Sequence, residues 1–215
     1  MTLVTPDAQS LWLFTIAALA LLLVPGPAVL YIVARSIEQG RTAGLVSILG
    51  IHTATLVHVL AASLGLSAVL ASSAIAFSIV KYAGAAYLIW IGLKKLFSRP
   101  PEAAAVSVVA HKLSRLFRDG FIVNLLNPKT ALFFFAFLPQ FVDVERGHAA
   151  MQMAILGLIF TALGFITDSC YSLAASTAGR FLRGNAAYLR AERYVSGTIM
   201  IGLGLTAAFA GNPKK

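Results

Sequence analysis

The sequence predicts an all-α integral membrane protein with six transmembrane helices, arranged as a 3+3 inverted-topology repeat. The first observation is composition: the 215 residues are 59% hydrophobic and only 12% charged, with a mean hydropathy of +0.84. A soluble domain carries about a quarter charged residues, so this chain belongs in lipid. Six helices of about 20 residues each would use most of the length. We therefore expect a single membrane domain over residues 1–215, with no second, soluble domain.

Runs with few or no charges place the predicted spans. Five of them are Ser10–Ala34, Ala43–Leu64, Gly120–Val142, Ala149–Gly179 and Tyr194–Ala210. The third span has two alternative positions, because Lys81 interrupts its apolar run. It begins near Ala71 with Lys81 inside, or near Tyr82 with Lys81 capping the helix end, and the second alternative is favoured. The N-terminal run has no Lys or Arg in its first ten residues and no small-residue cleavage site before Pro25, so we interpret it as a retained helix.

The charged residues indicate the topology. Twelve Lys and Arg residues follow the first, third and fifth spans, and only three lie on the other side of the membrane. Basic connections stay in the cytoplasm, so we expect both termini outside. The net charge of +9 is then a topology signal, and nucleic acid is not an expected partner. Two basic stretches with interspersed apolar residues, Ala105–Arg118 and Arg180–Arg193, are interpreted as short helices at the lipid interface.

The two halves of the chain, about 10–98 and 118–211, share local patterns. Lys81-Tyr82 in the third span corresponds to Arg193-Tyr194 at the sixth, and Pro25-x-x-Ala28 in the first corresponds to Pro128-x-x-Ala131 in the fourth. Each half contains three predicted helices, an odd number, so the second half must enter the membrane in the opposite direction. Inverted repeats of this kind are typical of secondary transporters. The basic cytoplasmic loop joins the halves.

Two proline motifs interrupt predicted spans. Pro25, Gly26 and Pro27 remove two N–H donors from the first span, and Asn127, Pro128 and Lys129 interrupt the fourth. A backbone group without a partner costs several kcal/mol in hydrocarbon, so a broken helix must be sheltered by protein or by a watery cavity. Paired interruptions in the two halves point to a substrate site. The alternative is a pair of plain proline kinks.

Three side chains that are costly in a bilayer fall at about the depth of these motifs. They are Lys129, Asp168 in the fifth span and His52 in the second. Lys129 and Asp168 could bind the carboxylate and the ammonium of a zwitterion, or neutralise each other, or do both in turn. His52 either lines the cavity or is a satisfied core histidine. His58 lies about 240° further round the same helix, so the two histidines cannot share a metal.

Several sequence stretches resemble the LysE/RhtB family of bacterial amino-acid exporters. They are LLLVPGPAVLYIVARSIEQGRTAG, G-x-H at Gly50–His52, KYAGAAYLIWIGLKKL, FRDGFIVNLLNPKTALFFFAFLPQF and ERYVSGTIMIGLGL. The resemblance implies a bacterial inner-membrane exporter of amino acids or close derivatives, driven by the proton motive force and dimeric, with no cofactor. It also implies that both proline motifs match signature positions and that Asp168 matches an acidic position. The spans Ser10–Ala34 and Ala43–Leu64 contain no carboxylate, which favours neutral substrates such as homoserine, threonine or homoserine lactone.

Two other classes of function are considered beside export. An intramembrane enzyme would need two acids, a His-rich metal set or a Ser/His/Asp arrangement at one depth, and only Asp168 and His52 qualify. A passive pore or a membrane scaffold remains an alternative to the exporter. For the exporter, the hypothesis is that Asp168 accepts either a proton or the substrate ammonium but not both, so that inward proton flow is coupled to outward export.

Overall fold

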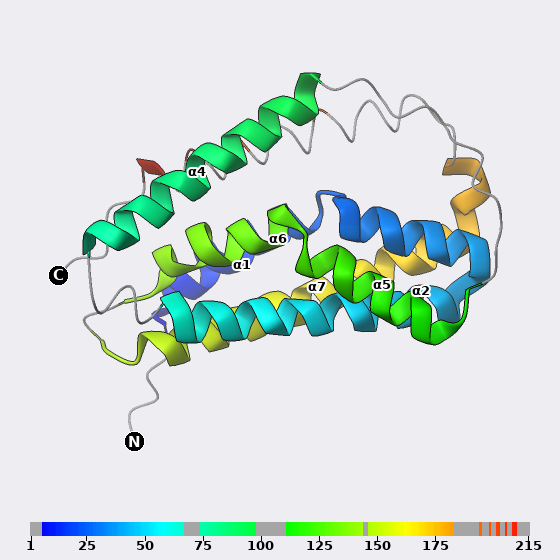
Figure 1. Ribbon diagram of the computed structural model, residues 1–215, viewed down its shortest axis with the longest axis horizontal. Helices are drawn as coiled ribbons and strands as arrows, with labels where there is room; N and C mark the ends of the chain where they lie inside the picture. The colour runs from blue at the N-terminus through cyan, green and yellow to red at the C-terminus, as the bar shows by residue number, and fades with distance from the viewer. Residues whose placement is uncertain are drawn as a thin grey trace.

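The structure is a computed structural model that describes residues 6–66, 74–97, 111–143 and 146–182, with isolated positions between 194 and 209. In these ranges every regular element is helical (Figure 1), which confirms the all-α class. Two helical stretches are long and apolar enough to cross a membrane, Pro27–Gly65 and Ala149–Thr177, and the bent pair Leu113–Leu125 with Pro128–Phe141 would make a third. The sixth predicted span is described only at those isolated positions, and the segment 183–193 lies outside the described residues. Six spans and the inverted repeat therefore stay predictions.

The first predicted span is divided at the Pro-Gly-Pro motif. Helix α1 covers Ala8–Leu22, and its first turn is capped by Asp7, whose carboxylate accepts a hydrogen bond of 2.8 Å from the N–H of Ser10. Helix α2 covers Pro27–Ala61 and begins with proline at its first position, where the missing N–H would have no intrahelical partner anyway. The predicted break is thus a true interruption of the helix, not a bend within it.

Helix α2 contains a reversal of the chain at Gly40. Gly40 has φ +81°, a conformation that favours glycine, and it is the non-helical residue inside α2. The ribbon turns back there (Figure 1), so Gly44 packs against the side chain of Ser36 from the preceding arm. Residues 27–39 therefore continue the first span, and residues 41–61 form the second. A π-helical turn, η1 (Ala62–Leu66), ends it close to the expected Leu64.

The third predicted span begins earlier than expected. Helix α4 runs Ala74–Phe97, so the backbone of Lys81 lies inside the helix, and the expectation that Lys81 caps its start is wrong. The physical reason is that the preceding residues Ala74–Val80 contain no charge, glycine or proline and that lysine itself is a good helix former, so nothing ends the helix there. In Figure 1 α4 lies along one edge of the bundle, next to α6.

The fourth predicted span consists of several short elements. Helix α5 covers Leu113–Leu125, α6 covers Pro128–Leu132, and a π turn and a 3-10 turn follow, η2 (Phe133–Phe137) and η3 (Leu138–Phe141). The two parts meet at 48°. The expectation that helix four starts at Gly120 is wrong, because α5 already includes the end of the basic stretch assigned to an interfacial helix. Its arginines Arg115 and Arg118 have exposed side chains, so the helix continues through them without burying charge.

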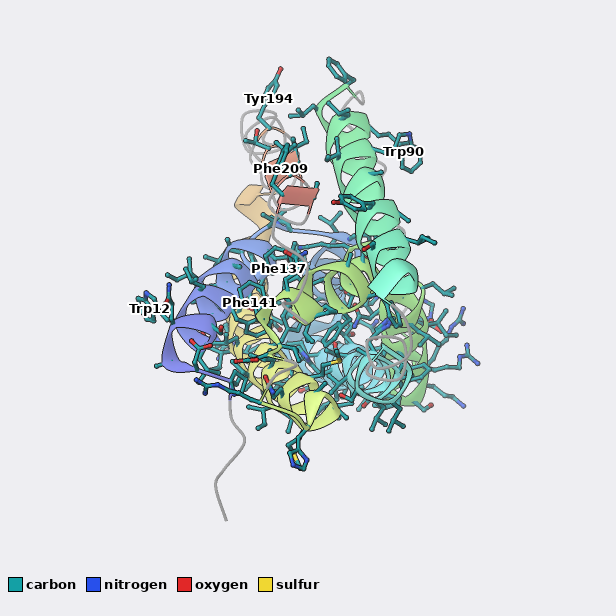
Figure 2. The ribbon with its side chains drawn as sticks, turned by 90° about the vertical axis from the view of Figure 1, so that its left-hand side faces the viewer. Trp12, Trp90, Phe137, Phe141, Tyr194 and Phe209 are labelled. Carbon is teal, nitrogen blue, oxygen red and sulfur yellow. The ribbon has the colours of Figure 1, made fainter. Side chains whose placement is uncertain are left out.

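The fifth predicted span is a single helix. Helix α7 covers Ala149–Leu182, close to the predicted Ala149–Gly179. It packs against α2 and α1. Aromatic rings from α1, η2 and α7 fill the space at one end of this packing, where Phe133 stacks on Phe160 at 4.6 Å between centroids and tilts against Phe14 at 5.7 Å. Figure 2 shows Phe137 and Phe141 among the helices, whereas Trp12 and Trp90 point away from the bundle. Outward-facing tryptophans of this kind suit a membrane interface.

Helices α2 and α5 approach each other closely through two glycines. A Cβ atom on Gly50 would collide with the backbone carbonyl of Phe117, and one on Gly120 would lie 2.8 Å from the backbone oxygen of Ser47. Small residues allow such backbone contact between membrane helices, where van der Waals packing drives association. This crossing fixes α5 against α2 and so positions the end of α5 at the second proline motif.

We expect Gly50→Ala to destabilise the protein strongly. The added methyl group meets the backbone of Phe117, which cannot rotate away, so the helices must separate, at a cost of about 1–3 kcal/mol or more. The matched control is Gly65→Ala, because a Cβ atom there has no neighbour within 4 Å. Thermal unfolding in detergent, followed by the monodisperse fraction, measures the difference. Equal melting temperatures for the two variants would contradict this account of the crossing.

Candidate functional site

A pocket lies where the two proline motifs meet. Five of the eight residues proposed from the sequence line it, namely Gly26, His52, Asn127, Lys129 and Asp168. Pro25, Pro27 and Pro128 are not among the lining residues. The cavity offers about 40 Å³ to the centres of water-sized molecules, and one water needs about 10–15 Å³ by this measure. In this conformation the pocket therefore holds a few waters, and an amino acid would need it to open.

The first break leaves backbone carbonyls without their helical donors. The oxygen of Leu23 would accept from the N–H of residue 27, which is proline and has none. It accepts instead from the hydroxyl of Tyr171 on α7, at 2.8 Å. The neighbouring oxygen of Val24 accepts from Nζ of Lys129 on α6, at 2.6 Å. Both donors come from the second half of the chain.

Gly26 makes the contact between Lys129 and the first break possible. A Cβ atom at Gly26 would lie 3.2 Å from Cδ and 3.6 Å from Nζ of Lys129. The stem of Lys129 therefore passes directly over the glycine, and Lys129 is only 8% exposed. The glycine of the Pro-Gly-Pro motif is thus explained by space for a side chain, since Gly26 itself needs no left-handed backbone conformation.

The second break is sheltered in the same manner. Pro128 cannot donate to the oxygen of Asn124, which accepts instead from the N–H of Asn127 at 3.1 Å and faces Nε2 of His58 at 3.2 Å. Because a carbonyl only accepts, this ring nitrogen of His58 carries the hydrogen. The side chain of Asn127 caps α6 by accepting from the N–H of Lys129 at 3.1 Å.

Asn124 is a site residue that the sequence reasoning missed. It is 2% exposed, and its amide nitrogen donates to the oxygen of Ile51 and to the hydroxyl of Thr55, both at 2.9 Å. Its amide oxygen accepts from the hydroxyl of Thr130 at 2.9 Å and from the amide of Asn127 at 3.3 Å. The available signal was a polar amide one turn before a proline in an apolar helix.

Each half of the chain therefore supplies donors to the break in the other half. Tyr171 donates to the carbonyl of Leu23 and Lys129 to that of Val24. His58 donates to the carbonyl of Asn124. Neither His58 nor Tyr171 was among the site residues proposed from the sequence. The two breaks form one polar unit, although each looks like an isolated local defect in the sequence.

Asp168 pairs with His52. Oδ2 of Asp168 lies 3.1 Å from Nε2 of His52, and the residues are 5% and 7% exposed. The imidazole fits against Gly164, where a Cβ atom would lie 2.8 Å from its Cε1. Of the two alternatives for His52, the structure places it in the pocket lining. The partner that the structure gives Asp168 is this imidazole, a pairing that the sequence analysis did not consider.

The pocket lining carries one positive and one negative side chain. Lys129 supplies an ammonium from α6 and Asp168 a carboxylate from α7, and several of the remaining lining residues are apolar, including Leu21, Ile51 and Phe160. Within the described ranges there is no group of three or more His, Cys, Asp or Glu side chains that could hold a metal ion. The site therefore offers charge complementarity and hydrogen bonds.

The sequence matches the family described as LysE type translocator over residues 19–211, nearly the whole length. The chain belongs to this family. This agrees with the resemblance found in the proline motifs and with the long apolar helices of a membrane protein. For this LysE type translocator no solved structure matches.

Three relatives illustrate the similarity. An uncharacterized membrane protein of Vibrio cholerae is 31% identical over 93% of this chain and 97% of its own. The homoserine/homoserine lactone efflux protein of Salmonella typhi is 32% identical over 80% and 82%. A leucine efflux protein of Salmonella choleraesuis is 27% identical over 80% and 79%. Two of the three relatives are therefore named for the efflux of small amino-acid compounds.

We expect His58→Phe to destabilise this translocator, because it keeps the stacking on Phe134 at 6.1 Å but removes one of the two donors to the oxygen of Asn124, which then keeps only the N–H of Asn127. The loss of one such hydrogen bond costs about 0.5–1.5 kcal/mol. In a Pro128→Ala background the new N–H of residue 128 can serve that carbonyl, so the cost of His58→Phe should fall. A double-mutant cycle of unfolding in detergent measures the coupling. Additive costs would show that His58 does not shelter the break.

Proposed function

We propose that this protein exports neutral amino acids or close derivatives across a bacterial inner membrane. The observation that carries the proposal is one buried pocket that contains both Lys129 and Asp168 and joins the two proline breaks. The names of the relatives, homoserine/homoserine lactone efflux protein and leucine efflux protein, support the substrate class. Homoserine, threonine and homoserine lactone are the first candidates. No cofactor is needed for this activity.

The binding mode follows from the contacts in the pocket. Nζ of Lys129 donates to a neutral carbonyl, that of Val24, and a substrate carboxylate would be the stronger acceptor because both partners are then charged. The substrate ammonium would approach Asp168 and the carbonyl that Lys129 leaves. Substrate binding would thus open the contact between the halves at Lys129 and create new ones through the substrate.

The preference for a neutral side chain follows from the same lining. Among the described lining residues, Asp168 is the one carboxylate, and the substrate ammonium uses it. A lysine or arginine substrate would bring a second cation into a site nine-tenths buried, and an unpaired buried charge is costly. An uncharged side chain faces Leu21, Ile51 and Phe160 on the apolar wall, or the hydroxyls of Thr55 and Thr130.

Transport would follow alternating access between the halves 10–98 and 118–211. We propose six spans with both termini outside, with one half rocking against the other about the two breaks. The bonds that cross between the halves at Leu23, Val24 and Asn124 would be the ones exchanged. Coupling to protons follows if the Asp168 site holds either a proton or the substrate ammonium. A homodimer is compatible with this scheme, since each chain contains a whole site.

The proposed activity is tested by counterflow in proteoliposomes. Purified protein is reconstituted with an unlabelled amino acid inside, and uptake of the labelled compound is measured over a panel that includes homoserine, threonine, leucine, lysine and arginine. We expect saturable counterflow for neutral compounds and none for the two cationic ones. Uptake without saturation would indicate a passive pore, and no uptake of any compound would indicate a scaffold; both results contradict an exporter.

We expect Asp168→Asn to abolish both counterflow and proton-driven efflux while the protein still inserts and remains monodisperse. The amide keeps the volume but loses the charge that pairs with the ammonium, and a charged hydrogen bond of this kind is worth about 1.5–3 kcal/mol, or roughly 10- to 150-fold in affinity. The matched control is Asp119→Asn, since Asp119 pairs with Arg115 and Arg118 outside the pocket. Counterflow at the normal rate and with the normal pH dependence in Asp168→Asn would defeat the assignment.

A further inference from the structure

The two ring nitrogens of His52 have different surroundings. Nε2 lies 3.1 Å from Oδ2 of Asp168. Nδ1 is buried and has no hydrogen-bond partner. The ring lines the pocket, and the residue is only 7% exposed. A buried polar atom without a partner is rare in folded proteins and calls for an explanation.

The partner of Nε2 determines what Nδ1 can do. A carboxylate accepts hydrogen bonds, so the hydrogen of the neutral ring lies on Nε2 and points to Asp168. Nδ1 then carries a bare lone pair. A proton can be added there without breaking any hydrogen bond of the protein, and the product is an imidazolium paired with the carboxylate. Histidine is the side chain whose charge changes in the range of about pH 5 to 8.

We infer that His52 carries the coupling proton of the export cycle, on Nδ1, while Asp168 stays ionised and holds the substrate ammonium. This inference rests on the proposed function and names the residue that couples it to protons. The charged groups facing His52 from the elements around the pocket are Asp168 on α7 and Lys129 on α6; the described lining residues on α1 and α5, such as Leu22 and Asn124, are uncharged.

Helix α7 holds the ring in the position that this role requires. Gly164 and Asp168 are four residues apart on one face of the helix. The glycine leaves room for Cε1 of the ring, the carbon between the two nitrogens, and the carboxylate accepts from Nε2. The same helical face therefore orients the ring and sets which nitrogen is protonated first. Nδ1 remains as the site for the second proton.

The proton and the substrate compete for the negative charge of Asp168. With neutral His52, the carboxylate attracts the ammonium. When Nδ1 takes up a proton from the outside, the imidazolium neutralises the charge of Asp168. The substrate ammonium then loses its partner, and the substrate is released to the outside. After the site turns to the cytoplasm, Nδ1 loses the proton and the next substrate binds. One proton moves inward for each substrate exported, no covalent bond of the substrate changes, and one positive charge enters per neutral zwitterion.

Transport assays on His52→Gln separate substrate binding from proton coupling. Glutamine retains an N–H donor for Asp168 but cannot take up a proton. With radiolabelled homoserine and leucine as probes, we expect whatever exchange remains at equal pH to lose its dependence on pH. Accumulation driven by a gradient of one pH unit, which supports about a tenfold concentration ratio per proton, should be lost. His148→Gln, at an exposed loop position, is the matched control and should keep the gradient-driven accumulation.

A second measurement uses the unmodified protein in detergent and so does not depend on the variant folding. In a weakly buffered solution with a pH dye, addition of homoserine or leucine should release protons at pH values where Nδ1 of the empty site carries a proton, and none at higher pH. His52→Gln should release none. Absence of proton release from the unmodified protein on binding, or gradient-driven accumulation by His52→Gln, would overturn the inference. Failure of the proposed function is recognised separately, because Asp168→Asn would then exchange normally.

Discussion

The interior of this protein depends on the requirement that backbone carbonyls freed by proline find donors where no bulk water is available. In hydrocarbon such a group costs several kcal/mol if it stays unpaired. The first break frees oxygens at Leu23 and Val24, and the second frees one at Asn124. Side chains of the opposite half donate to all three, and the oxygen of Asn124 also accepts from the N–H of Asn127. The polar pocket is a consequence of this requirement, because the donors must be polar and must be buried beside the breaks.

The same requirement explains why two ionisable groups can be tolerated at depth. Lys129 is partly solvated by the carbonyl of Val24, which acts as a fixed dipole in place of water. Asp168 has the imidazole of His52. Each of the two ionisable side chains therefore has a polar partner on another helix.

Close packing around the pocket complements its polar interior. Glycines at positions 50 and 120 bring α5 against α2, and rings around Phe133 fill the end formed by α1, η2 and α7. The cavity between them admits only a few waters.

Local features of the chain were predictable. The all-α class, the division of the first span at Pro-Gly-Pro, the interruption at Asn127 and the extent of α7 follow from hydropathy and from the missing N–H of proline. Helix ends were less predictable. Lys81 and the basic residues before Gly120 suggested boundaries, yet the helices run through both, because lysine and arginine are themselves good helix formers.

The sequence by itself determined where the chain breaks and which charges enter the membrane, since both depend on the chemistry of single residues and their neighbours along the chain. Only the tertiary structure decided the partners: Lys129 with Val24, 105 residues apart, Tyr171 with Leu23, 148 apart, and His52 with Asp168, 116 apart. Such pairs depend on which helix faces meet. Packing at glycines and aromatic rings decides which helix faces meet. A local pattern of residue types along the chain does not say which faces these are.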